Sequence, residues 1–211
     1  MDPLTRLAEI FSHFPGIGPR QAKRFVYYIL NRPNSDIKEF TKLIEEVKKL
    51  SLECSKCHRL YLLTSYLLAP SSALCSICSD PSRDQATLMV VARDSDFETI
   101  EKSGAYRGLY FILGGSVPVL DKEPEKRIRL KKLLEHVSGL ADSNSALKEI
   151  ILSLNTTPDG EHTTEIVREA LGQIIKDKHI KISILGRGLS TGAELEYADG
   201  ETIRNALRNR G

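Results

Sequence analysis

Four cysteines that lie close together are the side chains of this sequence best suited to chemistry. They form two Cys-x-x-Cys pairs, Cys54 with Cys57 and Cys75 with Cys78, and 17 residues separate the pairs. Each pair can place two thiolates on one tight turn, and two such turns facing each other build the tetrahedral sulfur shell that zinc prefers. Because four thiolates leave no open coordination position, we expect one structural Zn²⁺ per chain and no catalysis at the metal. We expect His58, beside Cys57, to be a surface residue and not a further ligand.

Other uses of the cysteines explain the pattern less well. A reducing compartment disfavours disulfides, and a redox Cys-x-x-Cys motif needs one pair near a thioredoxin-like unit, not two. Inert buried cysteines have no reason to be paired twice at the same spacing. The spacing therefore favours a four-cysteine zinc finger.

A glycine-rich turn near the N-terminus indicates phosphate binding. The segment Phe14-Pro15-Gly16-Ile17-Gly18-Pro19 interrupts two amphipathic stretches, which is typical of a helix-hairpin-helix. The glycines free the backbone to present N–H groups at the start of the second helix, where a nucleic-acid phosphate can bind without sequence preference. The alternative is a plain turn between helices with a solvated basic face. The residues predicted to contact DNA are Gly16, Ile17, Gly18, Arg20, Lys23 and Arg24.

The charge balance limits the function classes. The 211 residues include 30 basic and 28 acidic side chains, a net charge of +2, which excludes a histone-like protein that binds nucleic acid by bulk charge. Residues 1–83 carry a net charge of +4 and residues 84–211 one of −2, so any contact with a polyanion is expected toward the N-terminus. No apolar run is long enough to span a membrane and the N-terminus lacks the order of a signal peptide, so we expect a cytoplasmic protein without a membrane partner.

Two kinds of periodicity divide the chain. Apolar residues three and four apart predict three N-terminal helices, the third with Ser35 or Asp36 as its cap. After residue 84, short apolar runs alternate with helix-length segments, which is typical of a parallel α/β sheet. The predicted helices cover about 4–14, 19–30, 36–52, 95–103, 125–140, 162–177 and 200–208. The predicted strands cover about 88–92, 109–113, 149–154 and 180–185.

The order of these modules resembles the RecR family of bacterial recombination mediators, over about residues 4–210. The motifs that carry the resemblance are Pro15-Gly16-Ile17-Gly18, the four cysteines with Ser79-Asp80 and Arg83-Asp84, Ser103-Gly104-x-x-x-Gly108-x-Tyr110 leading to Leu113-Gly114-Gly115, Asp159-Gly160-Glu161-x-Thr163, and Gly188-Leu189-x-x-Gly192-x-Glu194 continuing to Asp199.

This resemblance implies an α/β chain with four parts. They are a helix-hairpin-helix region (1–52), a four-cysteine zinc finger (53–83), a Toprim-type parallel α/β domain (84–200), and a short C-terminal helix with a tail (201–211). It also implies sequence-independent DNA binding, a ring built from several copies, commonly a homotetramer, and joint action with RecO and RecF in gap repair. The protein would then be associated with the nucleoid when it is on DNA.

The acidic residues of a catalytic Toprim domain are replaced at key positions. Such a domain carries a glutamate after its first strand and an Asp-x-Asp pair after a later one to hold magnesium. The first strand here runs into Ala92-Arg93, and the later position reads Asn155-Thr156-Thr157, with Asp159 and Glu161 beyond it. Ile184 and Ser190 also replace an arginine and a proline that are usual in the family. We therefore expect no catalytic residues and a divergent family member.

Three functions are compatible with these features. A non-enzymatic, DNA-binding recombination mediator fits the largest number of them. A metal-dependent Toprim nuclease or primase-like enzyme is the alternative, and the missing first glutamate argues against it. A third possibility is a zinc-stabilised interaction protein that binds no nucleic acid.

Overall fold

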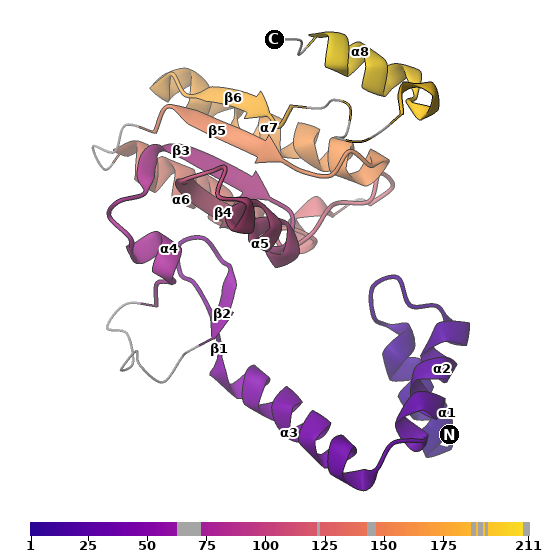
Figure 1. Ribbon diagram of the computed structural model, residues 1–211. Helices are drawn as coiled ribbons and strands as arrows, with labels where there is room; N and C mark the ends of the chain where they lie inside the picture. Colours follow the sequence, from indigo (N-terminus) through magenta and orange to yellow (C-terminus); the bar gives the residue numbers. More distant parts are fainter. Residues whose placement is uncertain are drawn as a thin grey trace. The chain divides into compact units, whose positions relative to one another are not determined.

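The structure is a computed structural model that describes residues 1–62, 73–121, 123–142, 147–186, 189, 192 and 194–208. Its internal contacts divide the chain into two compact units. Met1–Ser51 belong to the first unit, and Leu52–Tyr61 with the whole α/β part belong to the second. The elements of both units are labelled in Figure 1.

The first unit consists of α1 (Pro3–Ser12), α2 (Pro19–Leu30) and α3 (Asn34–Leu50). Asp2 begins α1, because its carboxylate accepts a hydrogen bond from the Thr5 backbone N–H. The helices α1 and α2 pack through small residues, and Ala8, Ala22 and Val26 are buried between them. This pairing forms the predicted helical hairpin.

Helix α3 has an apolar stripe that this unit does not cover. No residue of α3 is buried, and four apolar side chains on one face remain about half exposed. These are Phe40, Leu43, Ile44 and Val47. The prediction that Ser35 or Asp36 caps the helix was wrong, since α3 begins at Asn34 after Pro33 and no side chain caps it. Pro33 supplies the turn instead, because a proline cannot continue the preceding helix.

After α3 the chain forms a two-stranded sheet of β1 (Ser51–Glu53) and β2 (Leu60–Leu62), most of which belongs to the second unit, and then the short helix α4 (Ser76–Ser79). A four-stranded sheet with the order β4-β3-β5-β6 follows, and all its neighbouring strands are parallel. The strands are β3 (Asp84–Val91), β4 (Gly108–Ile112), β5 (Glu149–Ser153) and β6 (Lys181–Ile184). Leu88–Val91 of the central strand β3 are all buried, as expected for a strand covered on both faces.

Helices cover both faces of this sheet. Leu88 and Val90 point toward α6 (Leu130–Asp142) and α7 (Pro158–Lys178), which lie behind the sheet in Figure 1. Met89 and Val91 point the other way, into a smaller cluster around Phe97 of α5 (Asp94–Ser103). Two 3₁₀ turns, η1 (Pro124–Lys126) and η2 (Leu195–Tyr197), and helix α8 (Gly200–Arg208) complete the unit. The predicted fold class, a parallel α/β sheet with a helical N-terminus and a short C-terminal helix, is confirmed.

The element boundaries differ most from the predictions at three starts, and the first is β3, which begins at Asp84, four residues early. Helix α7 begins at Pro158, four residues early, because the Thr157 hydroxyl accepts a hydrogen bond from the Gly160 N–H and caps it. Helix α6 begins at Leu130, five residues late, because η1 occupies the preceding turn. Within the described part of the chain, none of the helices is long and apolar enough to cross a membrane.

Candidate functional site

The hairpin between α1 and α2 presents a free helix start. Gly16 has a φ of +76°, which few side chains tolerate, and the Ile17 N–H donates to the Phe14 carbonyl to close the turn. Gly18 is the N-cap of α2 and offers no side-chain acceptor to the first backbone N–H groups of the helix. These N–H groups therefore remain available to an anion.

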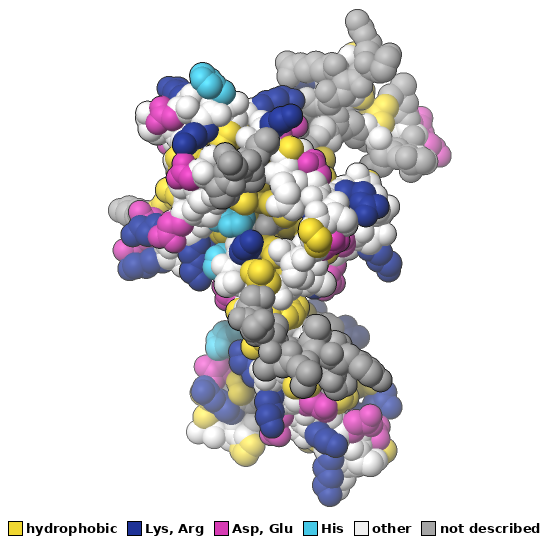
Figure 2. Space-filling view, turned by 90° about the vertical axis from the view of Figure 1, so that its left-hand side faces the viewer, with side chains coloured by type: hydrophobic (Ala, Val, Ile, Leu, Met, Phe, Trp, Pro, Cys, Tyr) yellow, Lys and Arg dark blue, Asp and Glu magenta, His cyan; other side chains and the backbone are white. Residues whose placement is uncertain are grey.

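Basic side chains surround this helix start. Arg20, Lys23 and Arg24 are exposed on the first two turns of α2. Residues 10–35 contain four basic residues and no acidic one, so the local charge is positive although the chain is nearly neutral. On the face of the α/β unit visible in Figure 2, by contrast, lysine and arginine alternate with aspartate and glutamate. The hairpin segment is thus more strongly cationic than this face of the α/β unit.

The four cysteines converge in the second unit. Cys54 and Cys57 lie in the turn between β1 and β2, and Cys75 and Cys78 lie at the start and within α4. Their sulfur atoms all lie within 4.8 Å of one another, and those of Cys57 and Cys75 are 3.6 Å apart. A tetrahedral zinc site with bonds of about 2.3 Å separates its sulfur atoms by about 3.8 Å. Three of the cysteines are buried, so the cluster fits a closed structural metal site.

Backbone hydrogen bonds shape this four-cysteine cluster. The Cys75 N–H points at the Cys54 sulfur at 3.4 Å, and the Cys54 N–H donates to the Arg59 carbonyl at 2.9 Å. The His58 N–H returns to the Cys54 carbonyl at 3.0 Å, with His58 in the left-handed region at φ 60°. The result is a tight turn that aims two sulfur atoms to the same side.

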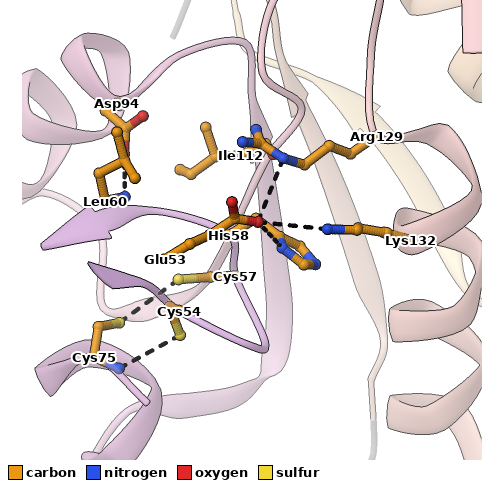
Figure 3. A network of polar contacts seen from close by, with 10 residues as sticks. All are labelled: Glu53, Cys54, Cys57, His58, Leu60, Cys75, Asp94, Ile112, Arg129 and Lys132. Atoms are coloured by element: carbon orange, nitrogen blue, oxygen red, sulfur yellow. Dashed lines mark hydrogen bonds and ion pairs between the residues drawn. The ribbon is translucent and has the colours of Figure 1, made fainter. Parts of the chain in front are cut away.

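His58 is not the surface residue that the sequence suggested. It is only 9% exposed, its ring packs edge-on against Phe111, and its Nδ1 lies 2.6 Å from Glu53 Oε1. Figure 3 shows that the Glu53 carboxylate also faces Arg129 and Lys132 from the start of α6. His58 is therefore part of a polar network that joins the four-cysteine cluster to the α/β sheet.

The Glu53 carboxylate is the centre of this network. Its Oε1 lies 3.7 Å from Arg129 Nε and 3.5 Å from Lys132 Nζ. Partial burial is the largest single influence and raises the pKa of the Glu53 carboxyl, but the hydrogen bond with His58 and the charges of Arg129 and Lys132 together outweigh it. On balance this pKa lies below its ordinary value, so Glu53 is ionised at neutral pH.

Three further contacts attach the segment around the four-cysteine cluster to the α/β sheet. The Ile112 N–H, on the free edge of β4, donates to the Cys57 carbonyl at 2.8 Å. The Leu60 N–H donates to the Asp94 carboxylate at 2.8 Å, and the Arg59 guanidinium lies 4.5 Å from the centre of the Phe97 ring. The segment therefore covers an edge strand that would otherwise expose unpaired backbone groups.

The positions of a catalytic Toprim site lie at the carboxyl ends of β3 and β5. Ala92 is buried, and Arg93 is exposed at the start of α5. The Asp159 carboxylate accepts a hydrogen bond from the Val119 N–H at 3.1 Å and so holds the loop after β4. Within the described part of the chain, the four cysteines are the only group of three or more potential metal ligands that lie close enough to share an ion.

The structure therefore brings the predicted residues together in two sets. The hairpin residues lie in the first unit and the four cysteines in the second. Gly188 and Ser190 lie outside the described residues, and Ile184 ends β6.

The predictions missed Glu53, Arg129 and Lys132. A glutamate next to the first cysteine was the only visible signal, because its cationic partners lie more than 70 residues away in the sequence.

Comparison with known families assigns three parts of the chain. Residues 4–48 match the helix-hairpin-helix of RecR, residues 86–186 match the Toprim domain, and residues 188–210 match the C-terminal region of RecR. The four-cysteine segment lies between the first two of these matches.

Full-length relatives agree with these matches. The recombination protein RecR of Lactobacillus acidophilus is 33% identical over 208 residues, which is 99% of this chain and 96% of the relative. RecR of Lactococcus lactis subsp. cremoris is 36% identical over 209 residues, with the same coverage. RecR of Bifidobacterium adolescentis is 34% identical over 208 residues, 98% of this chain and 94% of the relative.

Proposed function

Because the chain belongs to the RecR family of recombination proteins, we propose that it is a non-enzymatic, DNA-binding mediator of recombinational repair. It forms a ring or clamp on DNA and acts with RecO and RecF partners to help load recombinase. The observation that carries this proposal is the exposed start of α2, where unpaired N–H groups and a local excess of basic side chains coincide. Gly16, Ile17 and Gly18 bring the backbone to a phosphate, while Arg20, Lys23 and Arg24 supply charge.

Several copies acting together explain how a chain with a net charge of +2 binds a polyanion. Each hairpin provides one weak phosphate site, and a ring presents several such sites at high effective concentration. The half-exposed apolar stripe of α3 supports self-association, since it leaves Phe40, Ile44 and their neighbours to be covered by another surface.

We also propose that the four-cysteine cluster holds one structural Zn²⁺ per chain. Cys54, Cys57, Cys75 and Cys78 provide four sulfur ligands at suitable separations and leave no position for a substrate. When bound, the ion neutralises the thiolates and stabilises a segment that has little apolar core of its own. Glu53, which pairs with His58, adds ionic contacts to Arg129 and Lys132 at the start of α6 beside it.

Charge reversal at the hairpin tests the DNA surface. We expect Lys23→Glu with Arg24→Glu to weaken binding to a labelled oligonucleotide at least tenfold in fluorescence anisotropy. The slope of the logarithm of the binding constant against the logarithm of the salt concentration should also become shallower by about one for each lost phosphate contact. The control, Lys102→Glu with Lys176→Glu, makes the same change in charge at two exposed lysines of the α/β unit. Unchanged affinity in the hairpin variant would disprove this assignment.

A nicking assay tests the absence of catalysis. Supercoiled plasmid incubated with the protein and magnesium or manganese should remain intact, because the position after β3 carries Ala92 in place of an acidic residue. Metal-dependent nicking that is lost in an Asp159→Asn variant would instead support the nuclease alternative.

A further inference from the structure

The outer face of α2 carries an aromatic side chain in line with the basic residues. In a helix, residues three and four apart share a face, so Arg20, Arg24 and Tyr27 form one stripe along α2. The opposite side of the helix holds Ala22 and Val26, which are buried against α1. Tyr27 is 55% exposed, so its ring stands in solvent about one turn beyond Arg24.

The ring of Tyr27 is exposed, whereas one face of the similarly exposed Tyr28 ring is already covered by a cation. The Arg32 guanidinium covers Tyr28, 4.4 Å from the ring centre, and also hydrogen-bonds its hydroxyl. Over the residues that the structure describes, no cation or aromatic ring packs against Tyr27 in this way. A shallow hollow of about 560 Å³ lies beside it. The residues around this hollow are Gln21, Arg24, Phe25, Tyr27, Tyr28 and Asn31.

We propose that Tyr27 is a base-stacking residue and that the outer face of α2 is a binding site for unpaired nucleotides. This inference rests on the proposed DNA-binding function and names the form of DNA that the hairpin surface prefers. Arg20 and Arg24 bind the phosphates, and the Tyr27 ring stacks on the base of an adjoining nucleotide. Every base has an aromatic face, so stacking adds affinity without sequence preference.

Stacking of this kind discriminates between single and double strands. In a duplex each base face is covered by its neighbours in the stack, so the Tyr27 ring has no free face to contact. An unpaired nucleotide exposes its base and can turn it onto the ring while its phosphate stays on Arg24. The free N–H groups at the start of α2, where Pro19 itself has none, bind phosphates of either form, so the preference for a single strand comes from Tyr27.

Anisotropy titrations with three probes of equal length test this proposal: a single-stranded oligonucleotide, the same backbone with abasic sites only, and a duplex. We expect Tyr27→Ala to weaken binding to the single strand about fivefold or more. Its affinity for the abasic strand and the duplex should stay within about twofold of the wild type. Tyr27→Phe, which keeps the ring, should restore single-strand binding. Tyr28→Ala is the matched control and should have little effect.

Other outcomes would overturn the proposal. Equal weakening of all three probes, or a changed mass in native mass spectrometry, would mean that Tyr27 supports the fold or an interface between copies. No effect on any probe would mean that the ring does not contact DNA. If the Lys23→Glu, Arg24→Glu variant loses binding while Tyr27→Ala does not, this inference fails and the proposed function stands. If neither variant changes the binding, the hairpin surface itself is wrongly assigned.

Discussion

A single glycine at the start of α7 shows how closely the strand ends and helix starts are packed in the α/β unit. Gly160 is buried, and a Cβ atom at this position would lie 2.0 Å from the carbonyl oxygen of Asn155. The loop after β5 can therefore turn directly into α7 only where no side chain intervenes. This explains on physical grounds why glycine stands between Asp159 and Glu161.

We therefore expect Gly160→Ala to lower the free energy of unfolding by about 1–3 kcal/mol, since the backbone around Asn155 must move to relieve the overlap. The midpoint of urea unfolding of the intact chain, followed by circular dichroism, measures this change. Gly172→Ala in the same helix meets no atom within 4 Å. It should raise stability by up to about 1 kcal/mol, because alanine favours a helix. Equal effects of the two substitutions would contradict the packing argument.

His136 is a second residue whose behaviour follows from its surroundings. Burial against Phe111 and its neighbours, followed by the nearby His58 and Lys56, lowers the pKa of His136 to about 4. An unfolded chain binds this proton near pH 6.5. Between these two values the unfolded state holds one more proton, so stability falls as the pH drops from about 6.5 to 4, by at most about 3 kcal/mol.

NMR titration of the histidine ring protons measures this pKa directly. The His136 signal should shift near pH 4, and its neutral form should persist at pH 5.5. Between pH 6.5 and 4, a His136→Gln variant should lose less free energy of unfolding than the wild type does. A His136 signal that titrates near pH 6.5 would show that its ring is hydrated in solution.

At the scale of elements, the segment around the four-cysteine cluster covers the free edge of β4. The Cys57 carbonyl takes up the Ile112 N–H, and the Asp94 carboxylate at the start of α5 takes up the Leu60 N–H. Glu53 adds contacts to the start of α6. Metal binding and protection of the sheet edge should therefore depend on each other.

Removal of the metal tests this dependence. We expect a strong chelator, or Cys54→Ser, to release the bound ion and to speed hydrogen exchange at the amides of Leu60 and Ile112. Exchange at Ile151 in the interior of the sheet should remain slow, because its bonds to neighbouring strands do not involve this segment. Mass spectrometry of the intact protein reports the metal content. Loss of metal without faster exchange at Ile112 would show that the edge contact is independent of it.

At the scale of the whole molecule, the exposed stripe of α3 matters most. An amphipathic helix is stable in water when its apolar face is covered, yet the first unit leaves Phe40, Leu43, Ile44 and Val47 half exposed. The proposed ring provides a cover, because a second copy of the chain carries the same stripe. A two-fold contact of this kind is self-complementary.

We expect Phe40→Glu with Ile44→Glu to reduce the mass of the assembly in native mass spectrometry, since four carboxylates would then face one another across a two-fold contact. Lys42→Glu with Lys49→Glu adds the same number of carboxylates on the opposite face of α3 and should leave the mass unchanged. A wild-type protein that stays a monomer at micromolar concentration would contradict this use of the stripe.

The amino-acid pattern was enough to predict the longer helices, the four strands of the parallel sheet, the two Cys-x-x-Cys turns and the glycine turn, but not the short elements β1, β2 and α4. These features depend on residues that are near one another along the chain, such as apolar spacing and turn chemistry. The folded chain, by contrast, was needed to show that Glu53 contacts His58, Arg129 and Lys132, and that His58 is buried. These contacts form only when β4 and α6 pack against the segment around the four-cysteine cluster, which is distant in the sequence. No pattern of neighbouring residues predicts such contacts. The exposure of the α3 stripe has the same origin, because periodicity shows which face is apolar but not what covers it.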